Sequence, residues 1–252
     1  MTTGTDMNEP GKGTALRFDA VSKRYGTTVA LQTLSLAVAR GEAFGLAGMN
    51  GAGKTTLIKC LLDFCALDAG RIEVFGVSHR LTSARSRLAF LPERFVPPYY
   101  LTGRDFLRYM LTLYGVTYAQ APVEETLRAL DLEAAALTKP VRAFSKGMTQ
   151  KLGLAACLLS GRELLVLDEP TSGLDPRARA LLKQRLRALR GGGGTVFFTS
   201  HALADVEEIC DRMAVIHRGE LCFAGTPAQL QAEHGAATLE AAFLARIERA
   251  AA

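Results

Sequence analysis

The segment Gly48-Met-Asn-Gly-Ala-Gly-Lys-Thr55 has the residue types and spacing of a loop that binds phosphate groups. Its glycines let backbone N–H groups turn toward phosphate oxygens, and Lys54 adds a positive charge beside the β- and γ-phosphates. The Thr55 hydroxyl is suited to reach a phosphate-bound Mg²⁺. A chance glycine-rich turn is the alternative, but the segment lies between a predicted strand and a predicted helix. The predicted phosphate-binding residues are Gly48, Gly51, Gly53, Lys54 and Thr55.

Two adjacent carboxylates, Asp168 and Glu169, follow an apolar run in the segment 164–175. Neighbouring strand residues point to opposite faces, but at a strand end both side chains can turn toward one ligand. We expect Asp168 to contribute to a Mg²⁺ shell and Glu169 to act as a general base on water at the γ-phosphate. Helix capping by either carboxylate is the alternative, and the nearby phosphate-binding motif disfavours it.

Two further residues, His201 and Tyr25, each have two interpretations. His201 follows an apolar strand-like run that ends in polar residues. It is either a structural histidine or, where the strands end together, a residue that reaches the γ-phosphate. Tyr25 is either an aromatic residue at a strand edge or a platform on which a purine base stacks.

The segment 142–159 places Ser145-Lys-Gly147 directly before an amphipathic apolar run. A serine followed by a helix is a common N-cap, and the N-terminus of a helix attracts anions. The segment therefore predicts a helix start that holds an anion, although nothing in it says which anion.

The positions of these motifs follow from a mixed α/β pattern along the chain. Short β-rich runs lead up to the phosphate-binding loop, and two more strands follow it, the second stopped by Pro92. The region 95–159 has helical runs and no convincing strand, after which the strand pattern resumes at 162–170 as a run buried on both faces. A helix, the Gly191–Gly194 loop, another strand and a closing hairpin complete the pattern.

Composition sets broad limits on partners and compartment. The 252 residues are 48% hydrophobic and 22% charged, as in a soluble globular protein, with a net charge of +5. No lysine- and arginine-rich run marks a nucleic-acid surface, so we predict no nucleic-acid partner. The five cysteines lie in apolar stretches without a C-x-x-C pair, which indicates reduced thiols in a cytosolic protein. The sequence contains no bilayer-length apolar run and begins without the apolar core of a signal peptide.

Taken in order, these motifs resemble those of the nucleotide-binding subunits of ATP-binding cassette (ABC) transporters. The segment 144–148 stands where that family has its signature motif. A signature-type segment followed by the Asp-Glu-Pro-Thr-Ser-Gly-Leu-Asp run at 168–175 is specific to ABC ATPases. The resemblance covers about residues 14–230, nearly the whole chain. It implies that MgATP is bound, with Tyr25, Asn50 and Thr56 added to the ATP-binding residues. It also implies that Lys54, Glu169 and His201 are catalytic residues.

The resemblance also implies that two subunits pair head to tail, so that the signature of each contacts ATP bound to the other. Ser145, Gly147 and Asp175 would then act in trans. Two departures from the family pattern stand out. The usual Leu-Ser-Gly-Gly-Gln is Phe144-Ser-Lys-Gly-Met148 here, and the Lys146 side chain points either inward to the phosphates or into solvent. Glu93 replaces the usual glutamine that contacts Mg²⁺ or the attacking water, which resembles exporter subunits more than importer subunits.

The fold implied by the resemblance is a P-loop NTPase core with an N-terminal antiparallel β subdomain and an inserted α-helical subdomain. We expect a disordered tail at 1–13 and one ATPase domain at 14–252. Within that domain, we expect core segments at 14–93 and 159–230, a helical subdomain at 94–158 and a C-terminal helical tail at 231–252.

The function implied is ATP hydrolysis that powers a polytopic permease on another chain, in the direction of export. The subunit would be a homodimer or pair with a second ATPase subunit, and would lie in the cytoplasm against the membrane through the permease. One alternative is a soluble ABC ATPase that acts as a clamp on DNA or ribosomes. Another is a regulatory module that binds ATP without hydrolysing it.

The region 93–110 would meet the permease, because the family groove lies there. It carries the aromatic residues Phe95, Tyr99, Tyr100, Phe106 and Tyr109. Phe106 and Tyr109, at helical spacing, are expected to pack inside the helical insert. Tyr99 and Tyr100 follow a Pro-Pro step and cannot easily both point inward, so at least one is expected to be exposed.

Overall fold

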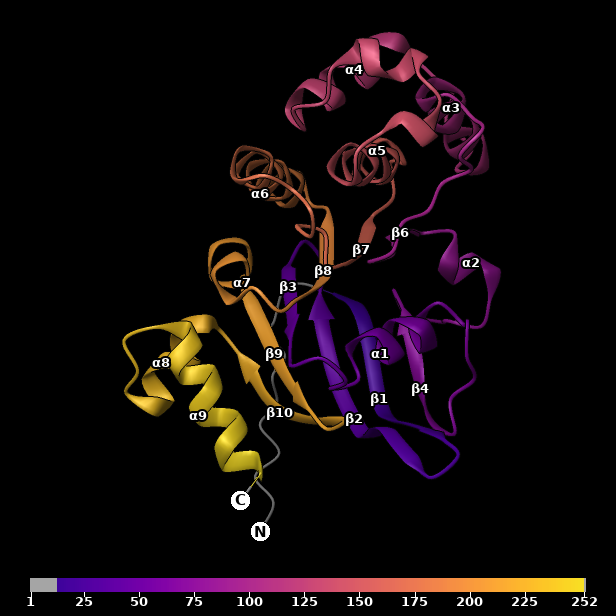
Figure 1. The fold of residues 1–252 in the computed structure, drawn as a ribbon. Helices are drawn as coiled ribbons and strands as arrows, with labels where there is room; N and C mark the ends of the chain where they lie inside the picture. Colours follow the sequence, from indigo (N-terminus) through magenta and orange to yellow (C-terminus); the bar gives the residue numbers. More distant parts are fainter. Residues whose placement is uncertain (1–12, 252) are drawn as a thin grey trace.

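The structure is a computed structural model that describes residues 13–251 (Figure 1). The expected disordered tail at 1–13 lies outside the described residues, apart from Gly13. Two sheets form the framework. A four-stranded sheet has the order β2-β1-β4-β5, and a six-stranded sheet has the order β10-β9-β3-β8-β7-β6.

The four-stranded sheet is antiparallel and lies early in the chain, as predicted. Its strands are β1 (Thr14–Tyr25), β2 (Thr28–Ala39), β4 (Ala69–Val74) and β5 (Val77–Ser78). The β1–β2 hairpin brings Tyr25 opposite Thr28 across its turn. Alternating apolar residues of both strands, among them Leu16, Phe18 and Leu36, are buried in a core shared with the second sheet.

The six-stranded sheet contains the strands whose carboxyl ends lead into the predicted site residues. Its strands are β3 (Ala43–Ala47), β6 (Leu88–Leu91), β7 (Leu164–Asp168), β8 (Thr195–Ser200), β9 (Arg212–His217) and β10 (Glu220–Gly225). All neighbours pair in parallel except the β9–β10 hairpin. Every residue of β3, β7 and β8 is buried, as expected for parallel strands covered on both faces.

Helices cover the six-stranded sheet and extend from one end of it (Figure 1). The bounds are α1 (Lys54–Leu61), α2 (Thr82–Arg85), α3 (Gly103–Leu113), α4 (Gln120–Ala129), α5 (Lys146–Leu159), α6 (Pro176–Gly191), α7 (Leu203–Ile209), α8 (Pro227–His234) and α9 (Leu239–Ala251), with 3₁₀ turns at Ala134–Thr138 and Val141–Ala143. The helices α3, α4 and α5 form the predicted helical insert. Residues 13–251 contain no helix that is long and apolar enough to cross a bilayer.

The packing of α3 corrects one expectation about the aromatic residues. Phe106 is buried and stacks edge to face on Phe95, as expected for a core residue. Tyr109 is 53% exposed, so the prediction that it packs inside the insert is wrong. The buried stripe of α3 is centred on Phe106, Leu107 and Leu111, and at about 100° per residue Tyr109 lies almost opposite Leu107.

Candidate active site

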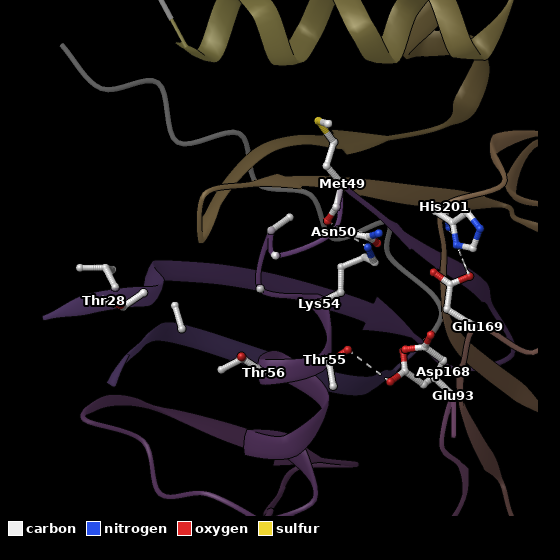
Figure 2. Close-up of a pocket in the computed structure, with 15 residues that line it drawn as sticks. Thr28, Met49, Asn50, Lys54, Thr55, Thr56, Glu93, Asp168, Glu169 and His201 are labelled. Atoms are coloured by element: carbon white, nitrogen blue, oxygen red, sulfur yellow. Dashed lines mark hydrogen bonds and ion pairs between the residues drawn. The ribbon is translucent and has the colours of Figure 1, made fainter. Parts of the chain in front are cut away.

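A pocket of about 370 Å³ opens where the phosphate-binding loop meets the carboxyl ends of β7 and β8 (Figure 2). This volume is within the range typical of small-molecule sites, about 300–1,000 Å³. Parallel strands that end at one edge bring side chains from distant parts of the sequence together. The lining residues are Thr28, Val29, Ala30, Met49, Asn50, Gly51, Ala52, Gly53, Lys54, Thr55, Thr56, Glu93, Asp168, Glu169 and His201.

The phosphate-binding loop has a backbone that only glycine fits well. Gly53 has φ 113° and directly precedes α1, and a Cβ atom built there would lie 2.6 Å from the carbonyl oxygen of Ala30. A Cβ on Gly48 would lie 2.6 Å from the carbonyl oxygen of Ile216. These contacts press the loop against β2 and β9, which leaves the start of α1 facing the pocket.

Lys54 folds back over this loop. Its Nζ donates to the carbonyl oxygens of Gly48 at 2.6 Å and Met49 at 3.2 Å. Burial lowers the pKa of Lys54, while the carboxylates of Glu169, Asp168 and Glu93 act in the opposite direction. The ammonium group is therefore already inside the pocket and close to three carboxylates, where an incoming polyphosphate could replace its backbone partners.

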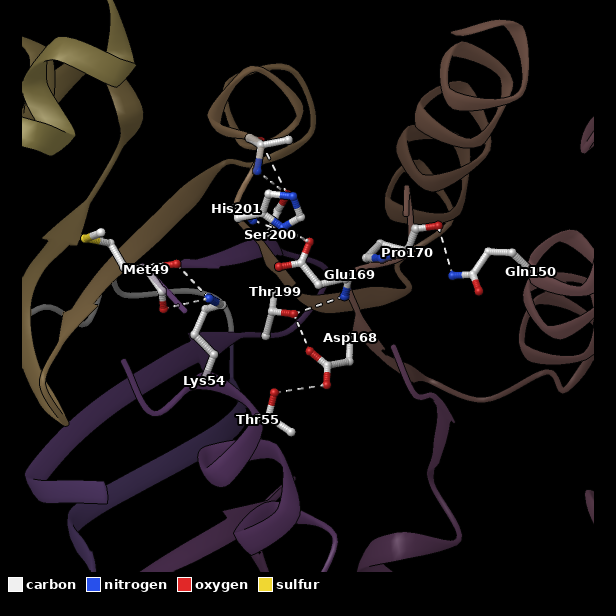
Figure 3. Close-up of polar contacts among 12 residues, drawn as sticks. Met49, Lys54, Thr55, Gln150, Asp168, Glu169, Pro170, Thr199, Ser200 and His201 are labelled. Carbon is white, nitrogen blue, oxygen red and sulfur yellow. Dashed lines mark hydrogen bonds and ion pairs between the residues drawn. The ribbon is translucent and has the colours of Figure 1, made fainter. Parts of the chain in front are cut away.

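Asp168 is held in place by two hydroxyl groups (Figure 3). Thr199 Oγ1 donates to Asp168 Oδ1 at 2.6 Å, and Thr55 Oγ1 donates to Asp168 Oδ2 at 3.4 Å. Burial raises the pKa of the Asp168 carboxyl, and the hydrogen bond from Thr199 opposes that shift. Thr199 is a site residue that the sequence interpretation missed. Its signal was a polar residue in the apolar run of β8, directly opposite Asp168 in the sheet.

Glu169 has an unusual backbone and a histidine partner. Its φ is 51°, which is uncommon for a residue with a side chain, and its N–H donates to Thr199 Oγ1 at 3.0 Å. Its Oε2 lies 2.8 Å from His201 Nδ1, and the carboxylate is 92% buried while the imidazole is largely exposed. The left-handed conformation turns Glu169 toward the pocket, directly after the strand that ends with Asp168.

The oxygen donors in the pocket suit Mg²⁺. Thr55 and Asp168 already face each other, and Glu93 lies close enough to raise the pKa of Asp168. Mg²⁺ prefers hard oxygen ligands and usually takes only one or two protein carboxylates, with phosphate oxygens and water completing the shell. Residues 13–251 contain no cluster of three or more His, Cys, Asp or Glu side chains arranged to hold a metal without such help. The residues present thus fit a Mg²⁺ ion that arrives with a nucleotide.

Tyr25 lies beside the pocket and does not line it. The ring is 48% exposed, its hydroxyl donates to Cys65 Sγ at 3.5 Å, and Lys23 Nζ lies 5.3 Å from the ring centroid. The hydrogen bond with Cys65 raises the pKa of Tyr25 to about 12. Because Tyr25 pairs with Thr28, which does line the pocket, its exposed ring is next to the pocket mouth.

Three of the predicted residues, Ser145, Gly147 and Asp175, do not line the pocket at all. Ser145 is exposed and caps α5 by accepting from the N–H of Met148 at 3.2 Å. Asp175 is exposed and caps α6 by accepting from the N–H of Ala178 at 2.9 Å, which lowers its pKa. These residues lie on a separate surface, so within one chain they make no contact with the phosphate-binding loop.

Lys146 also lies on that surface, and its direction was left open by the sequence. A Cβ atom on Gly173 would lie 3.1 Å from Cδ and Cε of Lys146. The aliphatic part of Lys146 therefore passes over Gly173, in the loop that leads to Asp175. The residue is exposed overall, so its ammonium group is carried at the edge of this loop.

The fold and the pocket define a P-loop ATPase domain. The chain belongs to the ABC transporter family: the family profile described as "ABC transporter" matches residues 31–172. It is an ATP-binding subunit of an ABC transporter and an ATPase. The predicted class, P-loop core, antiparallel β subdomain and helical insert are thus confirmed.

Two relatives illustrate the similarity. The daunorubicin resistance ATP-binding protein DrrA3 of Streptomyces coeruleorubidus is 42% identical over 226 residues, which are 88% of this chain and 71% of DrrA3. The Nod factor export ATP-binding protein I of Paraburkholderia xenovorans is 39% identical over 222 residues, which are 86% of this chain and 72% of that protein.

Solved structures show the same fold. The ATP-binding subunit of an ABC transporter superposes with a TM-score of 0.84 at 30% identity, over 92% of this chain and 99% of that one. A dimeric ATP-binding cassette in a post-hydrolysis state with ADP and Pi superposes with a TM-score of 0.76 at 20% identity, over 84% and 98% of the two chains.

Proposed function

We propose that this subunit hydrolyses MgATP as a head-to-tail dimer and powers a separate polytopic permease in the direction of export. The dimer is inferred from the separation, within one chain, of the pocket residues from the residues predicted to act in trans. The pocket holds Lys54, Asp168, Glu169 and His201, whereas Ser145 presents a capped, exposed helix start elsewhere on the same chain. A second copy in a head-to-tail arrangement brings that helix start to the open side of the pocket.

The chemistry follows from what each side chain already contacts. Lys54 and the start of α1 bind the β- and γ-phosphates, and the exposed ring of Tyr25 stacks on the adenine. Thr55 and Asp168 would hold Mg²⁺, which would neutralise charge on the phosphates, and Glu93 is a further candidate ligand. Glu169 orients and deprotonates the attacking water, and His201 holds the Glu169 carboxylate in place. Ser145, Gly147 and Asp175 complete the partner's site.

Transport requires a membrane partner, and the surface around Tyr99 and Tyr100 is suited to bind one. The two rings are 67% and 70% exposed and contact each other edge to face at 5.6 Å between centroids. Val96, which precedes them, is 87% exposed. The aromatic pair is exposed and only a few residues from Glu93 in the pocket. A partner that binds the pair can therefore change the position of Glu93. This arrangement would place the subunit in the cytoplasm, against the membrane through the permease.

Export is favoured by two observations. Glu93 replaces the family's usual glutamine, as in many exporter subunits, and one relative described above is named for Nod factor export. The cargo would be selected by the permease, so it is not assigned. Residues 13–251 contain no coiled-coil insert, which disfavours the clamp alternative. The contact between Glu169 and His201 disfavours the regulatory alternative.

The dimer is tested with the Glu169→Gln variant, which keeps the shape of the side chain and removes the proposed base. Size-exclusion chromatography with light scattering is run without nucleotide, with MgADP and with MgATP. We expect a dimer only with MgATP, together with a loss of turnover of roughly 10²–10⁴-fold. A variant that binds MgATP but remains monomeric at all concentrations would contradict the head-to-tail dimer. Near-normal turnover would contradict the role of Glu169.

A further inference from the structure

The first two turns of α5 contact the loop that follows Glu169 in the same chain. The contacts come from residues at positions i, i+1, i+4 and i+5 of the helix, which lie on one face. On this face, Lys146 passes over Gly173, and Gly147 is so close to Gly173 that an added Cβ would lie 3.0 Å from its carbonyl oxygen. The loop is thus seated along the helix that begins at Ser145.

Two polar side chains of α5 add to this contact between the helix and the loop. Gln150 Nε2 donates to the carbonyl oxygen of Pro170 at 3.2 Å, and both groups are buried (Figure 3). Lys151, with a side chain only 9% exposed, donates to the carbonyl oxygen of Asp131 at 2.8 Å and lies 3.7 Å from Asp175 Oδ2. The helix therefore contacts the loop next to Glu169 and again at Asp175.

The loop between these contacts is internally bonded. The N–H of Ser172 donates to the carbonyl oxygen of Glu169 at 3.0 Å, and the N–H of Leu174 to that of Thr171 at 3.2 Å. These two bonds hold the residues from Glu169 to Leu174 together as one segment. Pro170 has no N–H, so its carbonyl is the one backbone group at this position that can form a hydrogen bond. Gln150 binds that carbonyl, one residue from Glu169.

We propose that Gln150 is a positioning residue for Glu169 of its own chain. The proposal rests on the head-to-tail dimer. In that dimer the start of α5 meets the partner's nucleotide, while Gln150, one turn further along, holds the loop of its own site. Occupancy of one site is thereby transmitted through α5 to Glu169 of the other site, so the two sites hydrolyse ATP cooperatively.

The direct test replaces Gln150 with methionine, which keeps the length of the side chain and removes the donor. We expect kcat to fall roughly tenfold, the effect of one lost buried hydrogen bond, with the ATP affinity of the monomer unchanged. The Hill coefficient for ATP should fall toward 1. The matched control is Gln231→Met, which removes the 3.2 Å bond from Gln231 to Glu207 on α7 and should change neither quantity.

Mixed dimers separate a role in cis from a role in trans. Two full-length chains with different affinity tags are co-expressed with the proposed permease, so that the two subunits are held together without depending on the contact induced by nucleotide, and the complex is purified through both tags. One chain carries Ser145→Arg, which leaves a single working site. The Glu169 of that site belongs to the chain with Ser145→Arg. We expect slow turnover when Gln150→Met is on that same chain, and normal single-site turnover when it is on the other chain.

Each outcome of the mixed-dimer experiment has a defined meaning. Slow turnover only with Gln150→Met on the opposite chain would show that Gln150 acts on the partner's nucleotide, and would overturn the proposal. Equal turnover in both arrangements, whether normal or slow, would overturn it as well. A Ser145→Arg chain that leaves both sites working would contradict the head-to-tail dimer itself. Gln150→Leu, which also lacks the donor and adds no charge, replaces Gln150→Met if the methionine variant unfolds at a lower temperature than the Gln231→Met control.

Discussion

His201 Nδ1 lies 2.8 Å from Glu169 Oε2, and the backbone N–H of His201 donates to the same oxygen at 3.4 Å. Both contacts fall on one oxygen of the carboxylate, which leaves Oε1 directed at the pocket (Figure 3). Glu169 comes from the end of β7 and His201 from the end of β8, so the parallel pairing of these strands creates the contact. The imidazole thus fixes the orientation of the proposed base.

The first prediction concerns this contact. His201→Ala should lower kcat by roughly 10- to 100-fold, because a hydrogen bond to a charged group is worth about 1.5–3 kcal/mol and the carboxylate would lose its orientation. ATP affinity of the monomer, measured by calorimetry, should remain within about twofold. His234→Ala, on α8, is the control. A large loss of ATP affinity would mean that His201 serves binding more than it serves Glu169.

The second prediction concerns Thr199, which bonds both carboxylate residues. Thr199→Val removes the hydroxyl that fixes Asp168 Oδ1 while keeping the shape of the side chain. The Mg²⁺ concentration for half-maximal ATPase activity should rise roughly 10-fold or more, as is typical when a group that orients a metal ligand is lost. Thr195→Val, at the opposite end of β8, removes a bond to Gly41 and should lower stability without this change in Mg²⁺ requirement. An unaltered Mg²⁺ titration for Thr199→Val would assign Asp168 another role.

The third prediction concerns the surface of Ser145. Ser145→Arg places a bulky charged side chain on an exposed helix start, so the monomer should fold and bind ATP normally. When Ser145→Arg is combined with Glu169→Gln, MgATP should no longer induce dimerisation. Ser145→Arg alone should have no ATPase activity above that of a sample without enzyme. Ser83→Arg, at an equally exposed position on α2, should dimerise normally. If the monomer of Ser145→Arg bound ATP poorly, the helix start would face its own nucleotide.

The sequence was sufficient for most of the pocket, because its residues belong to motifs that are local in the chain. Lys54 and Thr55 follow glycines at fixed spacing, and Asp168 and Glu169 end one apolar strand. Parallel pairing of β7 with β8 then brings His201 beside Glu169, and this needs only the rule that such strands end at one edge.

What the sequence could not predict depends on contacts between distant segments. Thr199 is one polar residue in a strand, and its role appears only once the register places it opposite Asp168. The direction of Lys146 depends on Gly173, 27 positions away in the chain. The exposure of Tyr109 depends on which stripe of α3 faces α5, and two aromatic residues three positions apart fit a buried stripe equally well in sequence.

The last prediction concerns the aromatic pair that we propose meets the permease. Tyr99→Ala with Tyr100→Ala should leave basal ATPase activity within about twofold, because neither ring lines the pocket. Co-purification with the co-expressed permease should be lost, since exposed aromatic residues at the centre of an interface commonly contribute about 2 kcal/mol or more each. Tyr109→Ala removes an aromatic side chain of similar exposure from α3 and should co-purify normally. Glu93 lies in the pocket, and the two tyrosines are only a few residues away. A variant that still binds the permease, but whose ATPase activity the permease no longer stimulates, would show that this pair couples docking to hydrolysis and is not needed for binding. Unchanged co-purification together with unchanged stimulation would show that the permease binds elsewhere.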